Sequence, residues 1–424
     1  MSVFRAYDIR GIYGKELTDE LIYKIGLAFG KFFENNETIG IVRDVRIHSE
    51  RIKNILLSSL THTHNVIDFG IGSTPEAHYL AKVYSIPVLM ITASHNPPEY
   101  NGIKPIKNNG ESLNSEEIKI IEELTKKVEK PNQKNGIIEE ENGIEFYKWY
   151  IRKKFKKIKG YKIGYDPANS VLSLMKDILL DLGNEVYAIN EKLDGNFPSH
   201  PPDPSNEENL SELKKLVINK KLDIGFAFDG DGDRIGIVDK NGNIIKPDKY
   251  IIPFVKENRR FIIEISVPMY VRKYIEEKKG HYILSRTGHT FIKEKCKKYN
   301  AYMGIEYSGH IYFSENSYID DALFAGLMFL KEIDNFVDIN IENFKIIKKV
   351  IPKEKDLIRK ALEYGKNNGY HINNLDGELD GVELAKDDVR ILVRESQTEP
   401  VYRIIIESYK KDLDLERIFN DLIS

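Results

Sequence analysis

The sequence has 424 residues, of which 41% are apolar and 30% are charged, a balance typical of folded globular proteins and not of disordered chains. Lys and Arg together number 63 against 66 Asp and Glu, so the net charge of -3 gives no reason to expect nucleic acid binding. No run of about 18 apolar residues occurs and the N-terminus has no apolar signal core, so we expect a cytoplasmic protein that contacts no membrane.

The first part of the chain predicts alternating strands and helices. We expect a short strand within residues 3–14, a helix over 18–34, a strand over 38–44, a helix over 49–61 and strands over 65–69 and 88–91. A similar strand, helix, strand order recurs over 161–189, with an amphipathic helix at 171–182, and again over 281–311. This alternation predicts α/β domains with mixed, largely parallel sheets, whose functional loops gather at the carboxyl ends of the strands.

Polar stretches and turns divide the chain into four expected domains. Their bounds are 1–150, 151–245, 246–345 and 346–424. The first three are similar α/β domains. The last predicts the order strand, helix, three strands, helix, so we expect an α+β module there.

Residues 92–104, TASHNPPEYNGIK, follow the predicted strand over 88–91 and place Ser94 in a turn. Pro97 and Pro98 stop any helix or strand, so we expect an exposed, stiff loop. His95 and Lys104 bring two basic groups near the hydroxyl, which suits a serine that carries or passes an anion. A serine in such a turn can also make only a local hydrogen bond, and the pattern alone leaves both interpretations open.

Residues 222–238, LDIGFAFDGDGDRIGIV, contain three carboxylates between two apolar strands. Asp229, Asp231 and Asp233 alternate with glycines, so they can converge on one hard cation. A calcium loop of the EF-hand type needs an acid at its twelfth position, which here is Lys240, and flanking helices instead of strands. The pattern therefore favours Mg²⁺.

Three further loops carry polar groups. Residues 304–310, GIEYSGH, contain Glu306, Ser308 and His310, which can bond two sugar hydroxyls or form a plain turn. Residues 285–293 place His289 on a turn. The segment over 394–404 predicts either a phosphate-binding loop or a simple hairpin turn, and its polar residues are Arg394, Ser396, Gln397, Thr398 and Arg403.

In this order, the motifs TASHNP, DGDGDR, GIEYSGH and RESQTEP, with FRAYDIRG near the N-terminus, resemble those of the α-D-phosphohexomutases, the family of phosphomannomutase and phosphoglucomutase. The resemblance covers nearly the whole chain. It implies four domains around one central cleft, and a mutase that interconverts hexose 1-phosphate and hexose 6-phosphate through hexose 1,6-bisphosphate. It further implies sugar phosphates as the small-molecule partners.

The resemblance also implies roles for individual residues. Ser94 would carry the phosphate, and one Mg²⁺ per chain would be held by Asp229, Asp231 and Asp233, with Ser94 counted among the ligands. The residues near the transferring phosphoryl group would be Tyr7, Arg10, His95, Lys104 and Arg234. Glu306 and Ser308 would hold the sugar, with His289 and His310 close by. The non-reacting phosphate would be clamped by Arg394, Ser396, Gln397, Thr398 and Arg403.

A grip on the 3- and 4-hydroxyls ignores carbon 2, so we expect activity on both mannose and glucose phosphates. His310 and Lys104 are the candidates for the general acid and base. A phosphoglucosamine mutase, a phosphatase and a non-catalytic sugar-phosphate sensor are the alternatives. Two residues depart from the family pattern: Gln397 replaces the usual Gly or Asn, and Ser266 stands where dual-specificity bacterial enzymes have a lysine.

Overall fold

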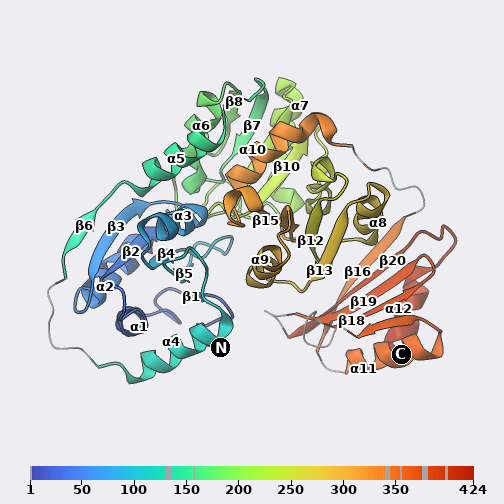
Figure 1. Cartoon of the computed structure of the whole chain (residues 1–424), viewed down its shortest axis with the longest axis horizontal. Helices are drawn as coiled ribbons and strands as arrows, with labels where there is room; N and C mark the ends of the chain where they lie inside the picture. The colour runs from blue at the N-terminus through green and yellow to red at the C-terminus, as the bar shows by residue number, and fades with distance from the viewer. Residues whose placement is uncertain are drawn as a thin grey trace. The chain divides into compact units, whose positions relative to one another are not determined.

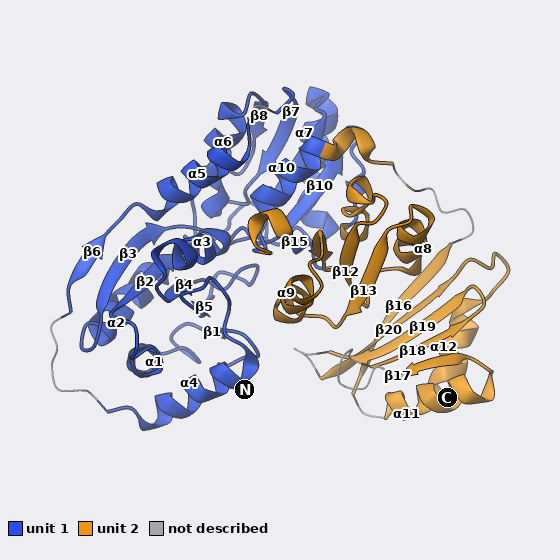
Figure 2. Ribbon diagram, in the orientation of Figure 1, with its two compact units in different colours: residues 1–246, 308–311, 319–331 blue, residues 247–307, 312–318, 332–424 orange. Residues whose placement is uncertain are grey.

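The computed structural model describes residues 2–129, 136–156, 158–337, 339, 344–353, 356–374, 381–396 and 400–424. Its strands form four sheets (Figure 1). The chain divides into two compact units (Figure 2). Unit 1 contains residues 1–246, 308–311 and 319–331, and unit 2 contains residues 247–307, 312–318 and 332–424. Within the described ranges, no helix combines the length and the apolar character needed to cross a bilayer.

Unit 1 begins with a six-stranded sheet. Its strands, in order across the sheet, are β1 (Ile9–Ile12), β5 (Tyr100–Ile106), β4 (Val88–Ile91), β2 (Thr38–Arg43), β3 (Asn65–Ile71) and β6 (Ile138–Glu140). Strands β4, β2, β3 and β6 run parallel, whereas β1 and β5 are antiparallel to their neighbours. The helices of this part of the chain are α1 (Asp19–Phe32), α2 (Ser49–Leu60), α3 (Thr74–Tyr84), α4 (Ser115–Lys127) and α5 (Gly143–Lys154).

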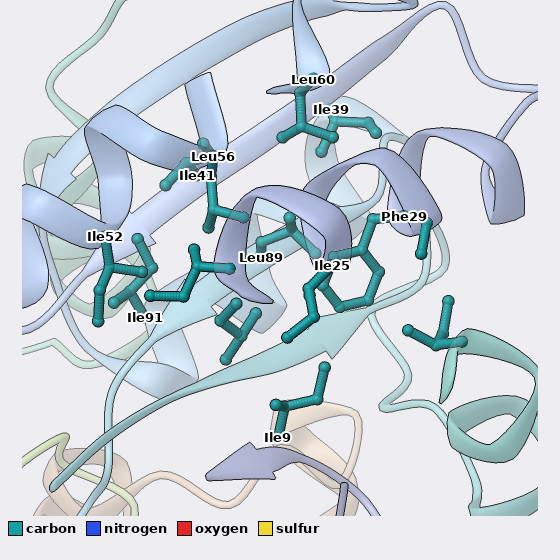
Figure 3. Close-up of a cluster of buried hydrophobic side chains, with 14 of the residues drawn as sticks. Ile9, Ile25, Phe29, Ile39, Ile41, Ile52, Leu56, Leu60, Leu89 and Ile91 are labelled. Atoms are coloured by element: carbon teal, nitrogen blue, oxygen red, sulfur yellow. The ribbon is translucent and has the colours of Figure 1, made fainter. Parts of the chain in front are cut away.

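Both faces of this sheet are buried under apolar side chains. Because successive side chains of a strand point to opposite faces, Leu89 and Ile91 of β4 join a cluster with Ile25 of α1 (Figure 3). Val88 and Met90 enter a second cluster, together with residues of α3. This two-sided burial explains why β4 is a continuous apolar run instead of an alternating one.

Helix starts in this part follow local capping chemistry. α1 begins after Thr18, whose side-chain oxygen accepts a hydrogen bond from the Leu21 N–H. α3 begins after Ser73, which forms a reciprocal capping box with Glu76. This capped end of α3 lies beside the aspartates of the DGDGDR segment.

The second sheet of unit 1 carries the DGDGDR segment in a hairpin. Its strands, in order, are β11 (Ile244–Ile245), β10 (Ile235–Asp239), β9 (Ile224–Phe228), β7 (Lys162–Asp166) and β8 (Glu185–Ala188), and its helices are α6 (Lys176–Asp181) and α7 (Ser211–Lys220). Strands β9, β7 and β8 are parallel, and β10 and β11 are antiparallel. The helix predicted over 171–182 is instead a short 3₁₀ helix, Val171–Met175, followed by α6.

A helix from later in the chain completes this second layer. α10 (Ala322–Glu332) contains Gly326, and a Cβ on this glycine would lie 3.1 Å from the Ile235 side chain of β10. The Phe324 ring contacts the Phe155 ring with a centroid distance of 4.9 Å. These contacts explain why residues 319–331 belong to unit 1.

Unit 2 contains the third and fourth sheets. The third has the strand order β13 (His281–Ser285), β12 (Arg260–Glu264), β14 (Met303–Ile305) and β15 (Ile311–Phe313), with helices α8 (Met269–Glu277) and α9 (His289–Lys298). The fourth is antiparallel, with the order β16 (Lys345–Pro352), β20 (Val401–Ser408), β19 (Val389–Glu395), β18 (Val382–Lys386) and β17 (His371–Asn374), and its helices are α11 (Leu357–Asn367) and α12 (Leu415–Ile423).

The predicted fold class is confirmed: three α/β sheets are followed by a C-terminal α+β sheet. One strand of the C-terminal part was missed, because four strands and not three follow α11. β17 has a single apolar residue, Ile372, and therefore shows no alternation in the sequence. The three domain boundaries, at 150, 245 and 345, stay predictions.

Candidate active site

Ser94 lies in the loop after β4, three residues beyond Ile91. Its backbone has φ 53°, in the left-handed region that few non-glycine residues adopt, and its N–H donates to the Thr92 hydroxyl at 2.9 Å. The Ser94 hydroxyl donates to Asp229 Oδ2 at 2.8 Å and lies 3.2 Å from Nδ1 of His95. The expected exposed loop is only partly correct: Pro97 and Glu99 are exposed, but Ser94, which lies against Asp229, is only 3% exposed.

Arg46 holds the serine loop in place, and sequence reasoning missed it. Its guanidinium donates to four backbone carbonyls of that loop, at 2.6 to 3.0 Å: those of Ser94, Asn96, Pro97 and Tyr100. The Arg46 Nε lies 3.3 Å from Asp44 Oδ2, and the guanidinium stacks over the Phe197 ring at 5.0 Å. The available signal was the charged pair Asp44 and Arg46 directly after β2, because β2 is parallel to β4 and both strands end at one edge of the sheet.

Asp229, Asp231 and Asp233 lie in the turn between β9 and β10, each at most 3% exposed, with one oxygen of each within 4.8 Å of the others. Asp229 Oδ1 accepts from the backbone N–H groups of Gly232, Asp233 and Arg234 at 2.9 to 3.2 Å. Asp231 Oδ1 and Asp233 Oδ1 are buried and have no hydrogen-bond partner among the described residues. Buried carboxylate oxygens without a partner are unfavourable, so this donor set fits a hard divalent cation such as Mg²⁺.

Lys104 bridges two of these carboxylates. Its Nζ donates to Asp231 Oδ2 at 2.7 Å and to Asp233 Oδ2 at 2.8 Å. Thr74, the first residue of α3, donates from its hydroxyl to Asp231 Oδ2 at 2.5 Å and from its N–H to the Asp231 carbonyl at 2.9 Å. The capped end of α3 therefore fixes the loop of carboxylates to the first sheet, which the sequence did not indicate.

The carboxylates and Lys104 perturb one another strongly. Burial, together with the neighbouring Asp233 and Asp231 carboxylates, raises the pKa of Asp229 well above its ordinary value. Burial also acts on Asp233, but Lys104 and the other nearby cations hold the pKa of Asp233 well below its usual range. Burial opposes the charge of Lys104, yet the two carboxylates it bridges raise its pKa, so Lys104 is an ammonium at neutral pH.

Two histidines and an arginine complete this cluster in unit 1. Arg234 donates from Nε to His310 Nε2 at 3.0 Å, and Nδ1 of His310 lies 3.7 Å from Asp233 Oδ1 and 3.6 Å from Asp320 Oδ2. Burial, and then the positive charges of Arg234 and Arg10, lower the pKa of His95 to about 2. The imidazole beside the Ser94 hydroxyl is therefore neutral at pH 7 and can accept a hydrogen bond.

Arg10 also lies in unit 1, on β1, which pairs with β5. Its guanidinium donates to Asn96 Oδ1 at 2.8 Å and to Asp8 Oδ2 at 2.5 Å, so it contacts the serine loop directly. Tyr7 precedes β1 and is half-buried. Ser308 belongs to unit 1 as well.

The remaining predicted residues belong to unit 2. Glu306 is 5% exposed and accepts a hydrogen bond from the Tyr312 hydroxyl at 2.5 Å. His289 is the first residue of α9. Arg394 and Arg403 are register partners on β19 and β20. Ser396 donates its N–H to the Val401 carbonyl at 2.9 Å, whereas Gln397 and Thr398 lie outside the described residues.

Comparison with known proteins identifies the family of the chain. Family models described as phosphoglucomutase/phosphomannomutase, alpha/beta/alpha domains I, II and III, match residues 1–132, 145–242 and 250–337. A phosphomannomutase from Methanocaldococcus jannaschii is 35% identical over 96% of this chain and 94% of its own length. A phosphomannomutase/phosphoglucomutase from Pseudomonas syringae is 33% identical over 98% of this chain and 93% of its own.

Two further matches complete the comparison. A probable phosphoglucosamine mutase from Pyrococcus abyssi is 32% identical over 96% of this chain and 94% of its own length. A crystal structure of a phosphoglucomutase/phosphomannomutase family protein from Burkholderia thailandensis superposes with a TM-score of 0.88 at 27% identity, and covers 100% of this chain and 96% of its own.

Three α/β sheets, a buried serine hydroxyl beside an aspartate triplet and these matches define a phosphohexomutase, an isomerase of hexose phosphates. The chain belongs to the phosphoglucomutase/phosphomannomutase family. The resemblance seen in the sequence motifs is confirmed.

Proposed function

We propose that the chain interconverts the 1-phosphate and the 6-phosphate of a hexose through a phosphoserine at Ser94 and a hexose 1,6-bisphosphate. The observation that carries this proposal is the Ser94 hydroxyl at 2.8 Å from Asp229, the first of three carboxylates that fit one divalent cation. A non-catalytic sensor would need neither the hydroxyl nor the aspartates. Both are buried here in a set of mutual contacts.

In the proposed reaction, the bond between Ser94 Oγ and phosphorus breaks as a free hydroxyl of the hexose monophosphate bonds to phosphorus and gives up its proton. The other phosphate of the resulting bisphosphate then returns to Ser94. One Mg²⁺ held by Asp229, Asp231 and Asp233, with Ser94 as a further ligand, would supply positive charge against the phosphate oxygens. Arg234 and Lys104 would add fixed positive charge near the same oxygens.

The proton of the sugar hydroxyl needs an acceptor, and His310 and Lys104 are the proposed acid and base groups. Lys104 is held as an ammonium by its two carboxylates, which suits charge stabilisation and proton donation. His310 Nε2 already accepts from Arg234, so a base role requires the Arg234 side chain to turn toward the phosphate. Arg10 donates to Asn96 of the serine loop and His95 lies beside the Ser94 hydroxyl, so both would orient the phosphoryl group.

Sugar recognition is proposed for the GIEYSGH loop, in which Glu306 and Ser308 bond the 3- and 4-hydroxyls, assisted by His289 and Tyr7. Such contacts do not read carbon 2, so we propose that mannose and glucose phosphates are both substrates. The non-reacting phosphate would be held by the C-terminal loop residues Arg394, Ser396, Gln397, Thr398 and Arg403. A phosphoglucosamine substrate is the second candidate, because one relative with 32% identity over nearly the full chain is a probable phosphoglucosamine mutase.

Intact-mass measurement tests the phosphoserine. We expect the purified chain to take up one phosphate from glucose 1,6-bisphosphate, and Ser94→Ala to take up none and to lose isomerase turnover. Ser58→Ala, which removes an exposed serine on α2, is the matched control and should behave like the parent chain. Removal of divalent ions with a chelator should stop isomerisation, and added Mg²⁺ should restore it.

Two measurements distinguish the proposed mutase from the alternative functions. Release of free phosphate in place of isomer would identify a phosphatase. Turnover on mannose 1-phosphate, glucose 1-phosphate and glucosamine 1-phosphate ranks the substrates, and a mannose to glucose ratio far from one would contradict the proposed dual specificity. Full isomerase turnover in Ser94→Ala would refute the phosphoserine mechanism itself.

A further inference from the structure

One buried carboxylate in unit 2 contacts two segments next to predicted sugar-facing residues: the loop that carries Glu306 and the turn before α9, whose first residue is His289. Glu264, the last residue of β12, is 2% exposed. Its Oε2 accepts the N–H of Tyr307 at 3.0 Å, and its Oε1 accepts the hydroxyl of Thr287 at 2.6 Å. Tyr307 directly follows Glu306, and Thr287 lies two residues before His289. Glu264 therefore fixes the positions of both loops relative to the third sheet.

The same end of β12 also contacts the arginine proposed as the phosphate clamp. Arg394 Nη2 lies 3.9 Å from Glu264 Oε1, and Arg394 Nε donates to the Ser266 hydroxyl at 3.1 Å. Ser266 is 5% exposed and Arg394 is 9% exposed. Ile265, which lies between Glu264 and Ser266 in the sequence, packs with Leu392 in an apolar cluster. The side chain of Arg394 is thus held at a fixed place on the third sheet, although the two contact points are about 130 residues apart in the chain.

Both oxygens of the Glu264 carboxylate take part in these contacts. One oxygen orders the loop with Glu306, and the other orders the turn before His289 and faces the cation of Arg394. A guanidinium facing a carboxylate can exchange that partner for a phosphate dianion, which binds arginine by the same charge-assisted hydrogen bonds. The carboxylate keeps its two loop contacts when that exchange occurs.

We propose that Glu264 is a positioning residue that couples the clamp arginine Arg394 to the loop carrying Glu306 and to the turn leading into His289, so that phosphate and sugar contacts are preorganised together. This inference rests on the proposed function, because it assigns Arg394 and Glu306 to substrate. It adds a residue that touches no substrate and that acts through the loops it orders.

Binding measured in the absence of chemistry tests the coupling. The parent is the full-length Ser94→Ala chain, and the ligand is glucose 6-phosphate titrated by calorimetry. Glu264→Gln removes the charge but keeps the shape, and we expect it to weaken binding on the order of 10-fold, the usual scale for losing a hydrogen bond to a charged group. Thr287→Val removes only one donor to Glu264, and we expect a smaller loss of roughly 3-fold.

A double-mutant cycle separates coupling from general damage. Arg394→Met should weaken binding alone, and Glu264→Gln combined with Arg394→Met should weaken it clearly less than the product of the two single effects. Glu407→Gln is the matched control, since Glu407 is a fully buried acid of the same unit that accepts from Met269 N–H and Arg390, each at 3.0 Å. Glu407→Gln should lower the melting temperature as Glu264→Gln does, with glucose 6-phosphate affinity within about 2-fold of the parent.

Unchanged affinity in both Glu264→Gln and Thr287→Val would overturn this inference and leave the proposed function intact. Single effects that multiply in the double variant, or an equal loss of affinity in Glu407→Gln, would also overturn it. A parent chain that binds no hexose phosphate would overturn the proposed function, and this inference with it.

Discussion

Arg46 provides the sharpest test of how the serine loop is held. Arg46 is 2% exposed, and its guanidinium donates to the carbonyls of Ser94, Asn96, Pro97 and Tyr100. Arg46→Met would leave these four carbonyls without their donor and would leave Asp44 without its countercharge. One hydrogen bond to a charged group contributes about 1.5 to 3 kcal/mol, but the four share one cation and do not add.

Buried ionic networks give a better estimate of the lost stability. Removing one partner of such a network lowers the free energy of unfolding by about 3 to 5 kcal/mol. We therefore expect Arg46→Met to lower the free energy of unfolding of unit 1 by that amount. Arg46→Lys keeps the charge but cannot reach all four carbonyls at once, so a smaller loss of about 1 to 3 kcal/mol is expected.

Urea titration followed by circular dichroism measures the stability, and amide hydrogen exchange over residues 92–102 reports the loop itself. We expect faster exchange in that segment and slower uptake of phosphate at Ser94 in both Arg46 variants. Arg43→Met is the matched control, because Arg43 lies on β2 and pairs at 2.5 Å with the half-exposed Glu50, a contact that contributes at most about 1 kcal/mol. An Arg46→Met chain with parental stability, exchange and phosphate uptake would refute this reasoning.

Two further substitutions test the close contact between Gly230 and the Ser94 loop, and the effect of the buried Glu76 on stability. A Cβ on Gly230 would lie 2.2 Å from the Ser94 carbonyl oxygen, so Gly230→Ala should lower stability by about 1 to 3 kcal/mol and isomerase turnover at least 10-fold. Gly326→Ala should do neither, because its Cβ would meet the end of the Ile235 side chain at 3.1 Å and the Phe226 ring at an ordinary contact distance of 3.5 Å. Burial raises the pKa of Glu76 from 4.5 to about 8, so the folded state binds more protons than the unfolded state between these values and stability should fall as pH rises through this window. Glu76→Gln removes that titration, and its melting temperature should fall less than that of the parent between pH 5 and pH 8; equal slopes would contradict the assignment.

Local pattern was enough for the order of elements and for the fold class, because strand and helix periodicities are properties of neighbouring residues. The predicted strand over 88–91 matches β4, and the DGDGDR turn lies between β9 and β10. Asp229, Asp231 and Asp233 occupy alternate positions in one predicted turn, so a cation site could be predicted from the sequence alone. The helix predicted over 171–182 is correct only in its second half, since Val171–Met175 form a 3₁₀ helix and α6 covers Lys176–Asp181.

Only the tertiary structure could decide what surrounds each motif. Ser94 and Asp229 are 135 residues apart in sequence, yet their side chains share a 2.8 Å hydrogen bond, and Ser94 is buried within a loop that its prolines predicted to be exposed. Arg46 and Glu264 have no motif of their own, since their partners come from other strands and loops. Distances of this kind depend on how sheets and helices pack, and that packing is not encoded in the spacing of adjacent residues.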